Sequence, residues 1–110
     1  MSPDEPALSL SSHINVWNTC LHILRARGYT LAVIGDPEPD GSYPVTKSWV
    51  AMKDRFNLTA DNPIELLGLA AVSEFTGPTQ YRPYWWKLDG PDITAELLEA
   101  AFPDPDRPSS

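Results

Sequence analysis

The chain has 110 residues, of which 42% are hydrophobic, and this fits one globular domain with a single core rather than a disordered protein. Its formal net charge is −7, from 8 basic and 15 acidic residues, which argues against binding to nucleic acid or to an anionic membrane surface. The sequence has no apolar run near the about 18 residues that cross a bilayer, no secretory signal and no second cysteine, so we expect a cytoplasmic protein.

Apolar residues recur every three or four positions through residues 13–28, which predicts an amphipathic helix. Its apolar stripe consists of Ile14, Trp17, Leu21 and Leu24, widened by Val16, Cys20 and Ile23. Ser11 or Ser12 is the expected N-terminal cap, because a hydroxyl oxygen can accept a hydrogen bond from a free amide of the first turn. We expect Gly28 to end the helix, because glycine adopts the left-handed conformation at no steric cost.

Two segments rich in strand-forming residues follow this helix. Residues 29–35 are apolar at nearly every position, so we expect a strand with both faces covered. Three prolines make residues 35–44 a loop. The alternation in residues 45–60 predicts a hairpin that turns at Asp54 and Arg55. On the first strand Trp49, Ala51 and Lys53 alternate with Val50 and Met52. On the return strand we expect one face to consist of Phe56, Leu58 and Ala60.

The clearest local signal in the chain is the helix predicted over residues 61–77. Asn62 can cap it, Pro63 suits the first helical position, and Gly77 can end it. Nearly all residues between these ends are apolar, so we expect this helix to be the buried centre of the fold. Gly68 costs about 1 kcal/mol relative to alanine in a helix, and a close backbone contact is expected to compensate for it.

The remaining segments complete the predicted fold. Residues 84–88, "YWWKL", suit an edge strand, and residues 91–102 suit a helix capped by Asp92 or Thr94. The apolar stripe of that helix consists of Ile93, Leu97, Ala100 and Ala101. The predicted fold class is α+β: a small antiparallel sheet of three to four strands with helices packed against it, in the order α-β-β-β-α-β-α. We expect one domain over residues 11–102 and disordered tails over residues 1–10 and 103–110.

The sequence offers no established catalytic or metal-binding motif. His13 and His22 lie on opposite sides of the first helix, and Cys20 and His22 are about 200° apart around it, so neither pair can act locally. We expect His13 to be capping or exposed, His22 exposed and Cys20 in the core. The loop with Asp36, Glu38 and Asp40 begins like a calcium loop, but its twelfth position is Lys47 in place of the required glutamate. We therefore expect no metal and no cofactor.

The most unusual feature of the sequence is the aromatic stretch at residues 81–87. In a strand, Trp85 and Trp86 would point to opposite faces. Either the last helix or a tail covers the second face, or one tryptophan forms an exposed patch with Tyr81 and Tyr84, flanked by charged residues. Tryptophan, tyrosine and arginine dominate the energy of many protein interfaces, because they combine large, stiff contact surfaces with polar tips.

Two functional hypotheses follow. The first is a small, acidic, non-catalytic protein-interaction domain, such as an immunity-type or antitoxin-type inhibitor of a basic protein. Its partner-binding residues are Tyr81, Arg82, Tyr84, Trp85, Trp86 and Lys87 as the anchor, with Asp36, Glu38 and Asp40 for electrostatic steering. The alternative is a small-ligand-binding domain, or an enzyme with a carboxylate-based site, lined by Trp85 or Trp86. A homo-oligomer that buries the aromatic patch by pairing edge strands is a third alternative.

Overall fold

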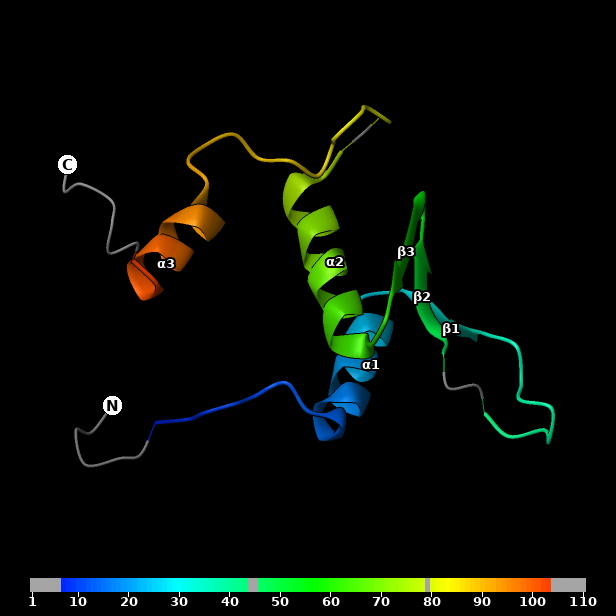
Figure 1. Ribbon diagram of the computed structural model, residues 1–110. Helices are drawn as coiled ribbons and strands as arrows, with labels where there is room; N and C mark the ends of the chain where they lie inside the picture. Colours follow the sequence, from blue (N-terminus) through cyan, green and yellow to red (C-terminus); the bar gives the residue numbers. More distant parts are fainter. Residues whose placement is uncertain (1–6, 44–45, 79, 104–110) are drawn as a thin grey trace.

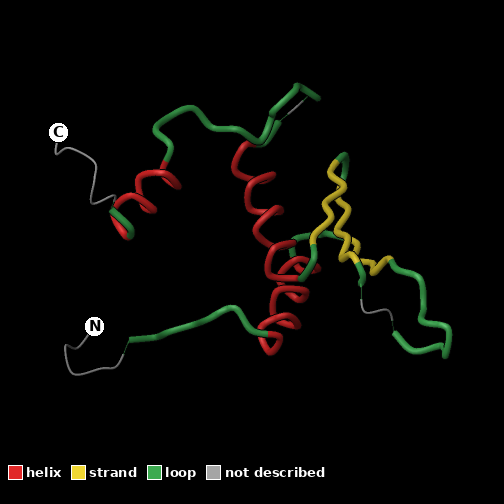
Figure 2. The backbone as a smooth tube through the Cα atoms, in the orientation of Figure 1, coloured by secondary structure: helices red, strands yellow, loops and turns green. Residues whose placement is uncertain are grey.

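The computed structural model describes residues 7–43, 46–78 and 80–103, which form an α+β fold with a three-stranded antiparallel sheet, as predicted (Figures 1 and 2). The elements are a 3-10 turn η1 (Ile14–Val16), α1 (Trp17–Ala26), β1 (Thr30–Ile34), β2 (Ser48–Lys53), β3 (Phe56–Ala60), α2 (Pro63–Thr76) and α3 (Ile93–Ala101). Most of both predicted tails, residues 1–6 and 104–110, lies outside the described residues.

The sheet has the strand order β1-β2-β3, and its register follows the predicted alternation. Ala51 at the middle of β2 lies opposite Leu31 on β1 and Leu58 on β3. The hairpin between β2 and β3 turns at Asp54, which adopts a left-handed backbone with φ of 53°, and at Arg55. The predicted faces of the hairpin are confirmed, because Trp49, Ala51 and Lys53 pair with Ala60, Leu58 and Phe56.

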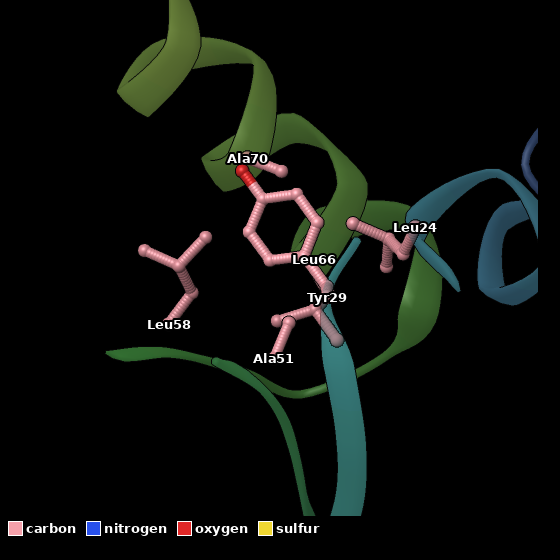
Figure 3. Packing of buried hydrophobic residues seen from close by; sticks show 6 residues of the cluster. All are labelled: Leu24, Tyr29, Ala51, Leu58, Leu66 and Ala70. Atoms are coloured by element: carbon pink, nitrogen blue, oxygen red, sulfur yellow. The ribbon is translucent and has the colours of Figure 1, made fainter. Parts of the chain in front are cut away.

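The core lies between this face of the sheet and the helices α1 and α2. The two helices lie side by side, with α1 against β1 and α2 against β2 and β3. Both helices and the sheet contribute side chains to the buried cluster, which consists of Leu24, Tyr29, Ala51, Leu58, Leu66 and Ala70 (Figure 3). Burial of these side chains removes apolar surface from water, and this burial is the main force that holds the helices on the sheet.

The ends of the helices follow the local chemistry, with one exception. The Asn62 side chain accepts a hydrogen bond of 2.9 Å from the Glu65 amide at the start of α2, and Gly77 and Gly28 adopt positive φ after α2 and α1. These predictions are confirmed. The predicted cap at Ser11 or Ser12 is wrong: the first helical turn is a 3-10 turn, and His13 Nδ1 caps it by accepting a 3.1 Å hydrogen bond from the Asn15 amide.

Three predictions about burial are wrong for the same reason: that the second helix is buried, that the first strand is covered on both faces, and that Gly68 contacts another backbone closely. Only one side of α2 is buried, through Leu66, Ala70 and their neighbours, and the strand β1 is mostly exposed. Apart from the neighbouring backbone of α2 itself, no described atom lies within 4 Å of the position that a Cβ at Gly68 would occupy, so the expected close contact is missing. The reason is that the described helices and strands form only two layers, so the outward faces of both layers meet no third layer.

The helix α3 begins as predicted but packs differently. The Asp92 carboxylate accepts a 3.1 Å hydrogen bond from the Ala95 amide, which confirms one of the two predicted caps. Every residue of α3 is exposed, so α3 does not cover the aromatic stretch. In the described part of the chain, no helix is long and apolar enough to cross a membrane.

Candidate protein-binding surface

The aromatic stretch forms a turn, so its predicted assignment as a strand is wrong. The Trp85 amide donates to the Arg82 carbonyl at 3.1 Å, the Lys87 amide donates to the Tyr84 carbonyl at 2.9 Å, and Tyr84 has a φ of 58°. Pro83 has no amide to donate to a neighbouring strand, and the left-handed backbone at Tyr84 breaks the alternation of side chains that a strand requires. The sequence order of the described elements is therefore α-β-β-β-α-α.

The two tryptophans of this turn differ in their surroundings. Trp85 is half-buried, and its ring centroid lies 5.6 Å from that of Phe56 on β3. Trp86 is 51% exposed and makes an edge-to-face contact of 5.9 Å with Tyr84, which is 69% exposed. Tyr81 is 83% exposed. The turn thus has one aromatic anchor on the sheet and three aromatic side chains that face solvent; we call these four residues the aromatic cluster.

Trp85 lines two hollows in the surface. The lining of the first is mostly apolar, and that of the second is mostly polar. One hollow of about 270 Å³ lies beside the hairpin; the residues that line it include Arg55, Phe56, Leu58, Tyr81 and Trp85. The other, of about 480 Å³, lies beside the C-terminal end of α2; its lining includes Thr76, Gly77, Arg82, Tyr84 and Lys87. The surface around the aromatic cluster therefore carries basic side chains, although the whole chain has a net charge of −7.

The acidic loop lies at the other end of the sheet. It joins β1 to β2, whereas the Arg55 side chain, at the turn between β2 and β3, donates a 3.2 Å hydrogen bond to the Pro78 carbonyl just before the aromatic cluster (Figure 1). The Asp40 carboxylate accepts hydrogen bonds from the amide and hydroxyl of Ser42, and these bonds lower the pKa of Asp40. The aromatic cluster and the acidic residues Asp36, Glu38 and Asp40 therefore lie at opposite ends of the sheet.

No known protein family, curated protein or solved structure matches this chain. Its function is therefore inferred from its own residues and their surroundings.

The two histidines and the single cysteine lie in or next to α1. His13 caps the first turn, His22 is exposed, and Cys20 is a free, buried thiol in α1, as expected. In the described part of the chain, no three histidine, cysteine or acidic residues are grouped so that they could hold a metal ion.

A polar cluster that the sequence did not reveal joins α1, β2 and α2 at the end of the sheet where Lys53 lies. The Arg27 guanidinium forms an ion pair with Glu74, and the Tyr29 hydroxyl donates a 3.4 Å hydrogen bond to the same carboxylate. Lys53 Nζ donates a 2.7 Å hydrogen bond to the Arg27 carbonyl and lies 5.3 Å from the centre of the Tyr29 ring. The two residues in each of these contacts are 24 to 47 positions apart, so no local pattern could have predicted the contacts.

This cluster leads to a prediction about alkaline pH. Burial, followed by the negative charge of Glu74, raises the pKa of Tyr29 above its ordinary value of 10.0. Tyr29 therefore ionises at a lower pH in the unfolded chain than in the folded chain. The stabilising effect of its protonated form is complete below pH 10 and is lost as the pH rises from there through the raised pKa of the folded chain. We expect the free energy of unfolding to fall more steeply in this range for the wild type than for Tyr29→Phe.

Urea unfolding of both proteins, from about pH 8 to about pH 11, measures this difference. The variant is the control, because every other ionisable group is present in both proteins. Parallel stability curves for the two proteins above pH 10 would contradict the prediction.

Proposed function

We propose that this chain is a non-catalytic protein-interaction domain that binds its partner through the aromatic cluster. The observation that carries this proposal is the exposure of Tyr81, Tyr84 and Trp86 on a turn that Trp85 anchors to Phe56. Exposed aromatic side chains on a fixed backbone provide contact area with little loss of conformational entropy on binding, which is typical of the energetic centres of protein interfaces.

The basic residues around the cluster and the negative net charge of the chain support a partner that carries both acidic and basic groups. Arg82 and Lys87 flank the exposed rings, so the part of the partner that meets the cluster would carry acceptor or acidic groups. The net charge of −7 supports attraction of a basic partner at longer range, as in an immunity-type or antitoxin-type inhibitor. If the rate of association with the partner falls as the salt concentration rises, this would support the long-range electrostatic attraction.

The experiment places a photo-crosslinking phenylalanine analogue at position 86 and, in a control protein, at position 43, because Tyr43 is an exposed aromatic residue at the other end of the sheet. Both proteins are irradiated in native lysate. We expect a crosslinked partner at position 86 only, and Tyr84→Ala/Trp86→Ala in the otherwise native chain to weaken binding of that purified partner by about 30-fold or more. Equal crosslinking at both positions, or equal affinity of the variant, would count against the proposal.

The hollow beside Trp85 favours a second candidate function, the binding of a small ligand. Its apolar lining by Phe56, Leu58 and Trp85 suits a small aromatic compound, although its volume of about 270 Å³ is at the lower limit for ligand pockets. A thermal-shift screen separates the two functions, because a compound in this hollow would raise the melting temperature of the wild type and of Trp86→Ala equally.

A further inference from the structure

The helix α2 is apolar on two opposite sides, and the described residues cover only one of these sides. Leu66 and Ala70 are buried against the sheet, whereas Leu69, Val72 and Phe75 recur every three residues on exposed positions, and Phe75 is 77% exposed. A helix that is apolar all round is normally covered all round. We call the surface formed by Gly68, Leu69, Val72 and Phe75 the outward face of α2.

An open groove lies beside the outward face of α2. This groove of about 530 Å³ lies between α2 and β3 and is lined by Gly68, Leu69 and Val72 of α2, by Thr59 and Ala60 of β3, and at one side by the acidic residues Asp61 and Glu65. Gly68 has an ordinary helical backbone, so no left-handed conformation requires a glycine there. What glycine does provide is room, because a neighbouring helix can approach α2 closely at a position without a side chain.

A suitable element is present in the same chain. Ile93, Leu97, Leu98 and Phe102, in α3 and at its C-terminal end, are each more than half exposed. Figure 1 shows α3 apart from the other elements, on the side of α2 away from the sheet. The radius of gyration is 19.1 Å, whereas a compact domain of this length has about 13 Å. Among the described residues, the apolar side chains of α3 and those of the outward face of α2 are thus both exposed to solvent.

We propose that two copies of this chain exchange α3, so that α3 of each copy packs on the outward face of α2 in the other. Complete burial of the exposed apolar side chains on the two surfaces would remove about 700 Å² per copy from water, which is close to the about 800 Å² per partner of a stable interface. Each surface is used once in each copy, so the contact closes with two-fold symmetry and does not propagate into a fibre.

The charges of α3 agree with this orientation. Glu96 and Glu99 lie on the side of the helix away from Leu97, as the rotation of about 100° per residue requires. With the apolar side docked, Glu96 and Glu99 of α3 remain in water. None of the residues of the aromatic cluster belongs to the two docking surfaces, so this proposal does not depend on the proposed binding function.

Sedimentation equilibrium of the full chain over a range of concentrations tests the dimer. We expect a mass of twice 12.2 kDa, and Leu97→Asp to weaken the association by about 100-fold or more because it places a charge in both contacts. Tyr43→Asp, an equally drastic change at an exposed residue outside the interface, should leave the dimer intact. Leu97 is exposed in the single chain, so circular dichroism of Leu97→Asp should show a normal fold. A mass of 12.2 kDa at every concentration would overturn the proposal.

Cysteine pairing identifies which α3 is bound. One chain carries Val72→Cys and a second, larger tagged chain carries Leu97→Cys, both with Cys20→Ala, and the mixture is oxidised gently. A disulfide between the two different chains is expected. A third protein with both new cysteines in one chain gives the opposite test: if it forms only an internal disulfide and stays monomeric, α3 folds back on its own α2, and the exchange is wrong.

Discussion

Replacing Leu66 by alanine is expected to lower the free energy of unfolding by about 3 kcal/mol. Leu66 is completely buried in α2, within the cluster of Leu24, Tyr29, Leu58 and Ala70. The loss combines the transfer free energy of the removed methyl groups with the cost of the cavity that remains. Total stabilities of domains are about 5 to 15 kcal/mol, and the buried cluster here is small, so this one change removes a large part of the stability.

Urea unfolding followed by tryptophan fluorescence measures this effect. The matched control is Leu69→Ala, the same substitution in the same helix at an exposed position. At concentrations below the dissociation constant of the proposed dimer, we expect the control to lose less than about 1 kcal/mol. Equal losses for the two variants would mean that the outward face of α2 is covered even in the single chain.

Replacing Trp85 by alanine is expected to lower the free energy of unfolding by about 2 kcal/mol and to release the aromatic cluster from the sheet. Trp85 provides the ring contact with Phe56 that anchors the turn, and it separates the two hollows. Without this contact, the backbone hydrogen bonds of the turn, from Trp85 to Arg82 and from Lys87 to Tyr84, have little support. We therefore expect a local loss of order in addition to the loss of stability.

Limited trypsin digestion reports this local change, because Lys87 provides a cleavage site within the turn. Cleavage after Lys87 should be much faster in Trp85→Ala than in the wild type. The control is Trp86→Ala, which removes the same side chain from an exposed position and should change the stability by less than about 0.5 kcal/mol and leave the cleavage rate unchanged. The prediction would be wrong if both variants were cleaved at the same rate.

The contrast between these two tryptophans also shows where sequence reasoning succeeded and failed at the candidate site. The composition of residues 81–87 identified the aromatic and basic side chains that lie together around Trp85. It did not identify the turn, because the alternation of a strand and the spacing of a short turn are indistinguishable over five residues. It also could not identify Phe56 as the anchor, since the two rings are 29 positions apart in the chain.

The sequence by itself determined the features that depend on neighbouring residues. Asn62 and Asp92 cap their helices through amides three positions away, Gly77 ends α2 by its own backbone freedom, and the alternation around Ala51 sets the register of the hairpin. In each case the interacting groups lie within a few residues of one another or repeat with the period of the element, so the chemistry of a short segment is sufficient.

Only the tertiary structure decided which apolar surfaces are covered. The sequence of α2 is apolar on both sides, and its periodicity does not reveal that the sheet and α1 cover one side while the outward face remains open. Tertiary packing also decided two other features: the exposure of α3, and the polar cluster that Arg27, Tyr29 and Glu74 form. Burial depends on which distant segments reach a surface, and that outcome is set by the packing of the whole chain, because hydrophobic attraction is non-directional and specifies no partner.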